Sequence, residues 1–491
     1  MITKTLSLVR KNFSFLLSAE VLIRAMMLVL TIFLARAYGT EKFGVYALAL
    51  SIGGLFEIFF NFGLGTVFMQ RVSAAPESLR EELKTFLPLR VILSVISLFT
   101  FVIFAAALQK PPETFFTLVL ASFYFSLFSI EAFLWSCFDA RQKMHFTAVT
   151  KLLKYSIIFG LGLYLTFTGS PVYQLMLAYI AGVTISIIST IAIILKYFTR
   201  LGWQISPAKW KAIIAEGWPI ALSGAFIFIY NSLDTIIISV MKGEQAVGLY
   251  QMSYKIIGTI FLLSALINQA YFPPLIDSAA KHKPDLPDIF NKSIQSALFW
   301  SIPITFGGML LAERIVLFIF GPDYLPGVPA FKILIVNCVI FFLSSAMTSL
   351  LYAIKKQKQT VKIFFYGALA NTVLNLFMIP YFGIEGAALT TVLAEIVVLF
   401  GIYLLARRIA PVKLISALWQ PFLCATVMCI VLSLFTINSL IITIGIGGLV
   451  YFGSFFLLSR LTASQTAAEK SATGKSTPHF AVHEDLPGNH P

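Results

Sequence analysis

Residues 172–197 read VYQLMLAYIAGVTISIISTIAIILKY, a run in which Lys196 is the only charged residue. A helix rises about 1.5 Å per residue, so this run is long enough to cross the roughly 30 Å hydrocarbon layer of a membrane. Similar runs of roughly 18 to 25 residues recur about fourteen times along the chain. Composition agrees, because 58% of the 491 residues are hydrophobic, 12% are charged and the mean hydropathy is +0.88. The sequence therefore predicts an all-α integral membrane protein with about 14 transmembrane helices.

The connectors between the predicted spans are short. We place the spans at roughly 13–36, 43–67, 86–108, 114–138, 147–168, 172–197, 215–241, 246–272, 293–312, 329–353, 361–381, 384–406, 413–435 and 438–459. Alternate connectors are basic and contain, among others, Arg10, Arg80, Arg141, Lys151, Lys154, Lys209, Lys283, Lys356 and Arg407. The other connectors are nearly bare, with Lys42, Lys110 and Lys242 as their clearest cations. The positive-inside rule then predicts a multi-pass protein of the cell (inner) membrane with both termini in the cytoplasm.

An internal repeat organises the predicted spans. Gly39 and Phe43-Gly44-Val45-Tyr46 follow the first span, and Gly243 and Val247-Gly248-Leu249-Tyr250 follow the seventh at the same spacing. Six spans per repeat preserve orientation, so we expect two six-helix lobes related by a pseudo-two-fold axis along the membrane normal. The predicted units are an N-terminal lobe at 1–198, an interfacial cytoplasmic linker at 199–214, a C-terminal lobe at 215–408, helices 13 and 14 at 409–460 and a disordered cytoplasmic tail at 461–491.

Short motifs then follow one another in a characteristic order. They are Phe62-Gly63-Leu64-Gly65, Asp234, Gly248-Leu249-Tyr250, Phe320-Gly321-Pro322-Asp323-Tyr324, and the run Asn371, Asn375, Ile379-Pro380, Gly383, Gly386-Ala387-Ala388, Thr390 and Thr391. Over about residues 5 to 460, this order resembles the Wzx-type polysaccharide flippases of the multidrug/oligosaccharidyl-lipid/polysaccharide (MOP) exporter superfamily. Asn61 departs from the pattern, since many relatives have an acid there.

The resemblance implies a flippase that moves a polyprenyl pyrophosphate-linked oligosaccharide from the cytoplasmic to the outer leaflet, for a cell-surface polysaccharide such as O-antigen or exopolysaccharide. It implies no enzymatic activity, and we predict no catalytic residue, no metal site and no cofactor. The expected partners are the lipid-linked oligosaccharide, membrane lipids, H+ or Na+ as a coupling ion, and polysaccharide polymerase machinery. Nucleic acid is not expected, because the cations are dispersed through the connectors rather than gathered into one patch.

Charged residues inside the spans mark the candidate site, because an unpaired charge there is costly. Arg24 offers a planar fork that suits a pyrophosphate, or it pairs with Glu20 one helical turn earlier. Lys255 is a second candidate ligand for the phosphates. Asp234 and Lys255 lie at equal depth below the turn near Glu244, so an ion pair between them competes with that role.

Buried acids are the candidates for ion coupling. We assign this role first to Asp234, with Asn231 as a possible further oxygen ligand, and then to Glu57 and Glu395, with Glu131 as another buried acid. Gln251, Asn371 and Asn375 are candidates for lining a sugar path, as are Asn268 and Asn337. For every amide the alternative is a hydrogen bond that joins helices.

Two other classes of function are consistent with part of the sequence. An ion-coupled exporter of small molecules, of the multidrug and toxin extrusion type, shares the two lobes but usually stops at twelve spans. Spans thirteen and fourteen favour a lipid substrate, because helices beside a lobe can form a groove for its tail. A membrane enzyme would need a large outer loop with catalytic side chains, and the predicted outer loops are too short.

Overall fold

The computed structural model describes the backbone of residues 2–435 and 438–473, and the side chains of residues 18–435, except 58 and 223–231, and of residues 438–462. The described chain is helical throughout. Its elements are α1 (Ile2–Asn61), α2 (Leu64–Ala74), η1 (Pro76–Ser78), α3 (Leu79–Ala107), α4 (Pro112–Ala140), α5 (Met144–Phe167), α6 (Val172–Tyr197), α7 (Pro207–Lys242), α8 (Glu244–Ala280), α9 (Leu286–Leu310), α10 (Ala312–Ile319), η2 (Pro322–Gly327), α11 (Val328–Ala353), α12 (Gln357–Ala406), α13 (Leu414–Leu434) and α14 (Leu440–Thr473).

Ten of the described helices are long and apolar enough to cross a membrane, and the bent pair α9 and α10, whose axes meet at 81°, would make eleven. The protein is therefore an all-helical membrane protein, as predicted. Two of these helices contain one residue with non-helical backbone angles, Gly39 in α1 (φ 69°) and Gly383 in α12 (φ 57°). The candidate span within α1 has 44 residues and that of α12 has 50, each far more than one crossing requires.

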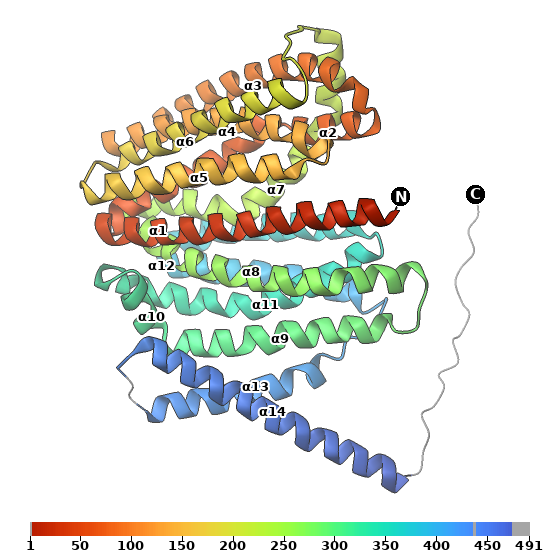
Figure 1. Cartoon of the computed structure of the whole chain (residues 1–491). Helices are drawn as coiled ribbons and strands as arrows, with labels where there is room; N and C mark the ends of the chain where they lie inside the picture. The colour runs from red at the N-terminus through yellow and green to blue at the C-terminus, as the bar shows by residue number, and fades with distance from the viewer. Residues whose placement is uncertain (1, 436–437, 474–491) are drawn as a thin grey trace.

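The helices lie roughly side by side, so the molecule has two ends that correspond to two membrane faces (Figure 1). Helix α1 begins and α14 ends at the same end, on the right of the view. We call this the basic end, because the Lys- and Arg-rich connectors lie there. The opposite end, where α7 gives way to α8 at Gly243, is called the bare end. Figure 1 shows α3 to α6 on one side of α1 and α8, α9 and α11 on the other, with α13 and α14 outermost.

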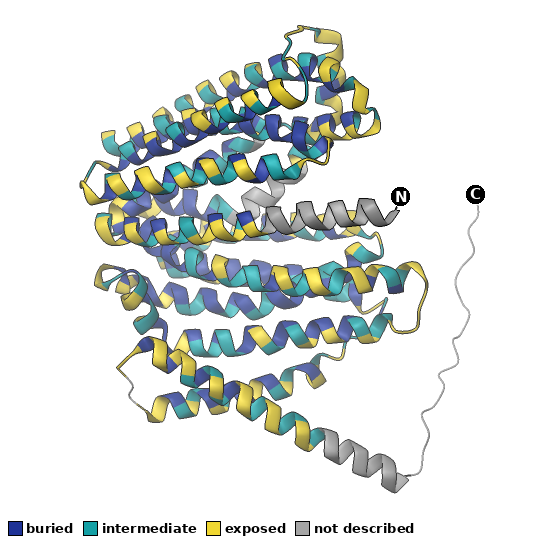
Figure 2. Ribbon diagram, viewed as in Figure 1, coloured by how far each residue is buried: buried dark blue, intermediate teal, exposed yellow. Residues whose placement is uncertain are grey.

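The hydrophobic cores show how the two halves meet. A shared core joins both halves towards the bare end and includes Leu34, Phe43, Tyr46 and Val183 with Val247, Tyr250, Tyr324 and Phe331. Towards the basic end the described cores are separate: one in the N-terminal half contains Leu64, Phe68, Phe86, Phe133 and Phe138, and one in the C-terminal half contains Leu275, Phe290, Leu298, Val398, Met428 and Tyr451. Buried residues accordingly run through the middle of each half, while exposed ones cover the outer faces (Figure 2). The halves thus share a core towards the bare end, while towards the basic end α7 contacts α2, where Glu216 pairs with Arg71 at 2.7 Å.

Two predicted boundaries differ from the structure. The segment 199–214 forms no separate interfacial helix within the described residues, because α7 already begins at Pro207, where proline suits the first helical turn. Trp210 instead donates a 2.9 Å hydrogen bond from its indole nitrogen to the carbonyl of Thr85. Helix α14 continues to Thr473, so the first part of the predicted disordered tail is helical. The remainder of that tail, 474–491, lies outside the described residues.

Candidate functional site

Asp234 of α7 is a buried acid of the predicted site, with 1% of its surface exposed. Tyr250 and Tyr254 of α8 both donate hydrogen bonds to its Oδ2 atom, at 2.5 and 3.0 Å. The backbone nitrogen of Thr235 donates to Oδ1 at 2.7 Å. The hydroxyl of Thr391, from α12, lies 3.3 Å from both tyrosine hydroxyls. Three helices therefore meet around one carboxyl group that is surrounded by hydroxyl and amide groups.

The predicted ion pair between Asp234 and Lys255 is wrong: no ion pair to Asp234 is found in the described part of the chain. The reason is the helical period. Tyr250 and Tyr254 are four residues apart, so they share the face of α8 that meets α7. Lys255 follows Tyr254 directly and so projects about 100° away around the helix. The two charged groups therefore lie on different faces of the helix pair.

The amides of the predicted sugar path have mixed positions. Gln251 donates a 2.6 Å hydrogen bond to the hydroxyl of Thr235, and so supports the surroundings of Asp234. Asn371 and Asn375 are buried one turn apart in α12, and Asn375 donates to the Oδ1 atom of Asn371 at 2.9 Å. Oδ1 of Asn375 is buried and has no hydrogen-bond partner among the described residues. Asn375 and Thr391 lie equally far from the break at Gly383, on its two sides. Because the chain turns at this glycine, the Oδ1 atom of Asn375 lies at the same depth as Thr391 and the cluster around Asp234.

The two predicted phosphate ligands have no ion pair within the described residues. Arg24 lies on the exposed side of α1 and Lys255 is half-buried on α8. The alternative pairing of Arg24 with Glu20 is wrong, because the Oε1 atom of Glu20 lies 2.8 Å from Nζ of Lys151 on α5. Arg24 and Lys255 are thus cations within spans, in different halves of the protein, whose charge a ligand can neutralise.

The remaining predicted coupling residues are dispersed. Glu395 of α12 is 3% exposed and accepts a 2.6 Å hydrogen bond from the hydroxyl of Ser344 on α11. Glu57 is half-buried in the N-terminal half. The side chain of Asn231 lies outside the described residues. The structure therefore does not bring Glu57 or Glu395 into the hydrogen-bond network of Asp234.

The structure also contains a buried ion pair that sequence reasoning missed. Nζ of Lys154 lies 2.8 Å from Oε2 of Glu131, and both side chains are fully buried. The ammonium also faces three aromatic rings, of which Phe128 is the nearest at 4.2 Å. The prediction that Lys154 is a connector cation is therefore wrong. The signal was present, because Glu131 and Lys154 lie almost equally far from the turn between α4 and α5.

Arg90 is a second fully buried cation of the N-terminal half. Its Nε atom donates to the carbonyl of Ser129 at 2.9 Å, and its guanidinium also donates to the carbonyl of Phe60. These carbonyls belong to α4 and α1, so Arg90 of α3 joins three helices. Its buried position is consistent with a packing role.

The bare end is closed by contacts between the two halves. Lys110, in the turn between α3 and α4, forms a 2.9 Å ion pair with Glu244 at the start of α8, and these side chains are 12% and 14% exposed. Lys110 also donates to the carbonyl of Ser239 at 2.7 Å. Tyr324 donates a 3.1 Å hydrogen bond to the carbonyl of Ala35 in α1. These contacts must break if the halves are to separate at this end.

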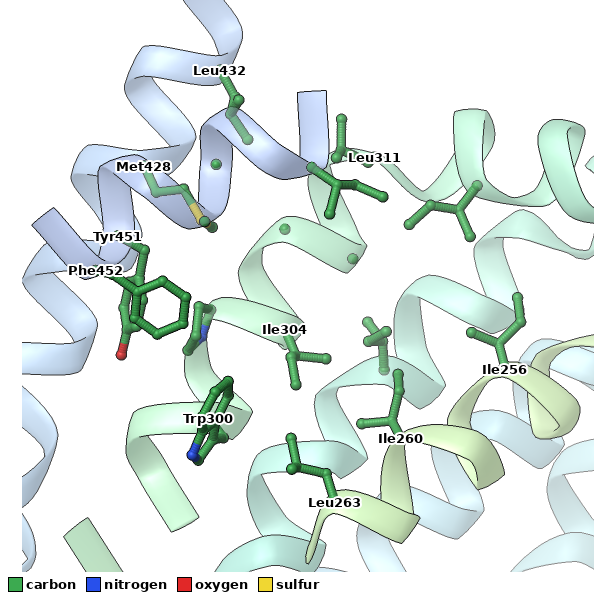
Figure 3. Close-up of a pocket in the computed structure, with 18 of the residues that line it drawn as sticks. Ile256, Ile260, Leu263, Trp300, Ile304, Leu311, Met428, Leu432, Tyr451 and Phe452 are labelled. Carbon is green, nitrogen blue, oxygen red and sulfur yellow. The ribbon is translucent and has the colours of Figure 1, made fainter. Parts of the chain in front are cut away.

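An apolar pocket of about 350 Å³ lies between the C-terminal half and the last two helices. Ile256, Ile260 and Leu263 of α8, with Trp300 and Ile304 of α9, form one wall (Figure 3). Met428 and Leu432 of α13, with Tyr451 and Phe452 of α14, form the other. Its lining is almost wholly hydrocarbon and suits an apolar chain.

Comparison with known proteins gives consistent results. The sequence model of a family described as "Polysaccharide biosynthesis protein" matches residues 9–279. A putative O-antigen transporter of Shigella flexneri is 24% identical over 379 residues, which cover 73% of this chain and 88% of that protein. A probable low-salt glycan biosynthesis flippase of Haloferax volcanii is 22% identical, over 74% of this chain and 76% of that protein. The lipid II flippase MurJ in an inward closed conformation superposes with a TM-score of 0.77 at 18% identity, over 91% of this chain and 99% of that one.

Proposed function

Because the chain belongs to the polysaccharide biosynthesis protein family, whose members are transporters rather than enzymes, we propose that it flips a polyprenyl pyrophosphate-linked oligosaccharide. The lipid moves from the cytoplasmic to the outer leaflet of the cell membrane by alternating access, for synthesis of a cell-surface polysaccharide. The family resemblance predicted from the motifs is confirmed by this match. The substrate and the direction of movement are our proposal, supported by the features that follow.

We propose fourteen spans with both termini in the cytoplasm. Turns at Gly39 and Gly383 make two spans each of α1 and α12, and α9 with α10 forms one bent span. With α7 added, the ten candidate helices become fourteen spans. The same end of the molecule then carries the basic connectors, the start of α1 and the end of α14, as the positive-inside rule requires of the cytoplasmic side. The repeated turn glycines support two lobes in a parallel pseudo-two-fold arrangement.

The single observation that carries the proposal is the placement of Arg24 and Lys255. Each is a span cation without an ion pair in the described structure, one in each lobe. An unpaired cation in a span costs about 2.5 to 3.5 kcal/mol on insertion scales, so a retained one calls for water or an anionic ligand. A pyrophosphate supplies that ligand, and the guanidinium of Arg24 can bind it in a bidentate manner. The shared core closes the bare end, so the headgroup would enter from the basic end.

The apolar pocket between α8, α9, α13 and α14 gives the lipid tail a place beside the lobe. A polyprenyl chain has no polar atoms to satisfy, and the pocket lining of Ile, Leu, Trp and Phe side chains matches that chemistry. The tail can stay in this apolar surface while the headgroup moves. Helices α13 and α14 would therefore help to bind the lipid tail, a function that a twelve-span exporter of small molecules does not need.

Asp234 is our proposed coupling residue. A carboxylate with hydroxyl donors and no counter-ion among the described residues is poised to take up a proton or a monovalent cation, and neutralisation then changes which lobe arrangement is favoured. Asn375, with its unpartnered oxygen at the same depth, and Thr391 are further candidate ligands. The membrane potential can also contribute, since each charge moved through 100 mV is worth about 2.3 kcal/mol.

The proposal is tested by removing the gene and measuring where the lipid-linked oligosaccharide accumulates. We expect it to build up in the inner leaflet, beyond the reach of an external glycosidase, and the wild-type chain to restore its exposure. Unchanged exposure, together with increased sensitivity to small cationic drugs, would instead support the exporter class.

A further inference from the structure

A second apolar crevice, of about 220 Å³, lies on the C-terminal half. Its walls are Leu343 and Met347 of α11, Ile396, Leu399, Phe400 and Tyr403 of α12, and Leu414 of α13. None of these residues lines the pocket between α9 and α14, so the two apolar spaces are distinct. Ile396 is 45% exposed and Phe400 is 61% exposed, which shows that the crevice opens onto the protein surface. In a membrane protein such an apolar opening faces lipid chains.

The crevice reaches the level of the lipid headgroups at the basic end. Tyr403 lies one turn before α12 ends at Ala406, and Leu414 is the first residue of α13. The loop that joins these two helices therefore crosses directly over the end of the crevice. This loop is the place where the surface changes from apolar to polar.

Three exposed cations, Arg407, Arg408 and Lys413, lie in that loop. The guanidinium carbon of Arg407 lies 5.8 Å from the ring centre of Tyr403, a residue that lines the crevice. None of the three cations forms an ion pair with any described residue. Basic residues next to a lipid-facing crevice are the arrangement that binds acidic headgroups.

We propose that this crevice binds an anionic phospholipid from the leaflet at the basic end. One acyl chain fills the space between α11, α12 and α13, and the phosphate is held by Arg407 and Lys413. A net negative headgroup is required, because a zwitterionic lipid would bring its own ammonium group against the same cations. The proposal does not depend on what the protein transports, because no residue of the candidate transport site lines the crevice.

The bound lipid would stabilise a helix pair next to the transport site. Leu343 and Ile396 are the chain neighbours of Ser344 and Glu395, whose 2.6 Å hydrogen bond joins α11 to α12. Filling the crevice supports both helices at this point. Lipid binding should therefore raise the thermal stability of the whole protein, which gives the proposal a readout that is independent of transport.

The test uses the full chain, delipidated in a neutral detergent and titrated with phosphatidylglycerol or phosphatidylcholine, with thermal unfolding and native mass spectrometry as readouts. We expect phosphatidylglycerol to bind and raise the melting temperature, and phosphatidylcholine to bind at least about tenfold more weakly. Arg407→Gln with Lys413→Gln should abolish this preference, and Leu399→Trp should block both lipids by filling the crevice.

The matched control is Lys196→Gln with Arg200→Gln. These two exposed cations lie at the basic end of α6, and Lys196 also lies over a tyrosine ring, that of Tyr197 at 5.0 Å. The control removes the same charge from the same membrane face and should keep the phosphatidylglycerol preference.

Equal binding of phosphatidylglycerol and phosphatidylcholine to the wild-type chain would overturn the proposal. So would an equal loss in the control variant, which would indicate general charge attraction. If Leu399→Trp does not fold, the double variant Arg407→Gln, Lys413→Gln still tests the proposal, because both of its substitutions are at exposed positions.

Discussion

Gly44 and Gly248 occupy equivalent positions in the two repeats, and each lies against the backbone of the other's helix. A Cβ atom on Gly44 would lie 1.8 Å from the carbonyl oxygen of Glu244, and one on Gly248 would lie 1.9 Å from that of Thr40. Thr40 and Glu244 are themselves equivalent, so the contact is reciprocal. Two helix backbones can approach this closely only where a side chain is missing. The pair therefore closes the bare end of the protein.

Gly248→Ala should hold the bare end open. The added methyl group would overlap the backbone of Thr40, which cannot move away as a flexible side chain could. We expect the protein to fold, the two halves to separate at this end and transport to fall by about tenfold or more. The distance between spin labels at Lys42 and Lys242, in a cysteine-free background, should increase.

Gly258→Ala is the matched control. Gly258 lies in the same helix, and a Cβ atom there would meet nothing within 4 Å. It should leave the label distance and transport unchanged. An unaltered distance in Gly248→Ala would contradict the closing role of the glycine pair.

The ion pair between Lys110 and Glu244 should stabilise the same closed arrangement. Lys110→Glu and Glu244→Lys should each shift the protein towards opening at the bare end, and the charge-swapped double variant should regain closure. We expect a coupling energy of about 1 kcal/mol, because the pair is largely shielded from solvent. The same spin-label distance measures it, and strictly additive effects would show that the pair is not coupled.

Asp234→Asn should keep the fold and substrate binding but lose the response to an ion gradient. The amide keeps the shape of the side chain but cannot exchange a proton or hold a cation as a carboxylate does. Uptake into liposomes with and without a proton or sodium gradient measures the response. Asp323→Asn, which changes an exposed acid of η2, is the control. A normal gradient response without the Asp234 carboxylate would rule out its coupling role.

The buried pair of Lys154 and Glu131 should be structural. Lys154→Met would leave the Glu131 carboxylate buried without a counter-charge and should destabilise the protein by about 3 to 5 kcal/mol. Adding Glu131→Gln should restore most of that stability, as thermal unfolding would show. A double variant as unstable as Lys154→Met alone would refute the pairing account.

Much of the fold follows from the sequence, because a membrane restricts the chain to long apolar helices. The repeated glycines at 44 and 248 also predicted equivalent positions, and the structure places them in reciprocal contact. The breaks predicted as connectors between spans coincide with Gly39 and Gly383, single residues with non-helical backbone angles at which two helices meet. The extent of α14 was not predictable from apolar periodicity, since its last residues are polar.

The candidate site was less predictable, because depth along a helix is read from the sequence more easily than direction around it. Asp234 and Lys255 lie about equally far along the chain from the turn between α7 and α8, but Tyr250 and Tyr254 occupy the face that meets α7. Counting residues from the connecting turn in the same way places Glu131 and Lys154 at almost equal depth, and these two residues do form an ion pair. Which faces meet is decided by packing between helices distant in the sequence, and one chain does not reveal that packing.

The most direct test of the proposed flippase is transfer of a fluorescent polyprenyl pyrophosphate-linked oligosaccharide across liposomes that contain the purified protein. An external glycosidase reports how much headgroup reaches the outer leaflet. We predict rapid transfer by the wild-type chain, partial transfer by Arg24→Lys, which lacks the bidentate fork, and near-complete loss in the double variant Arg24→Ala, Lys255→Ala. Transfer by that double variant at the wild-type rate would contradict the account.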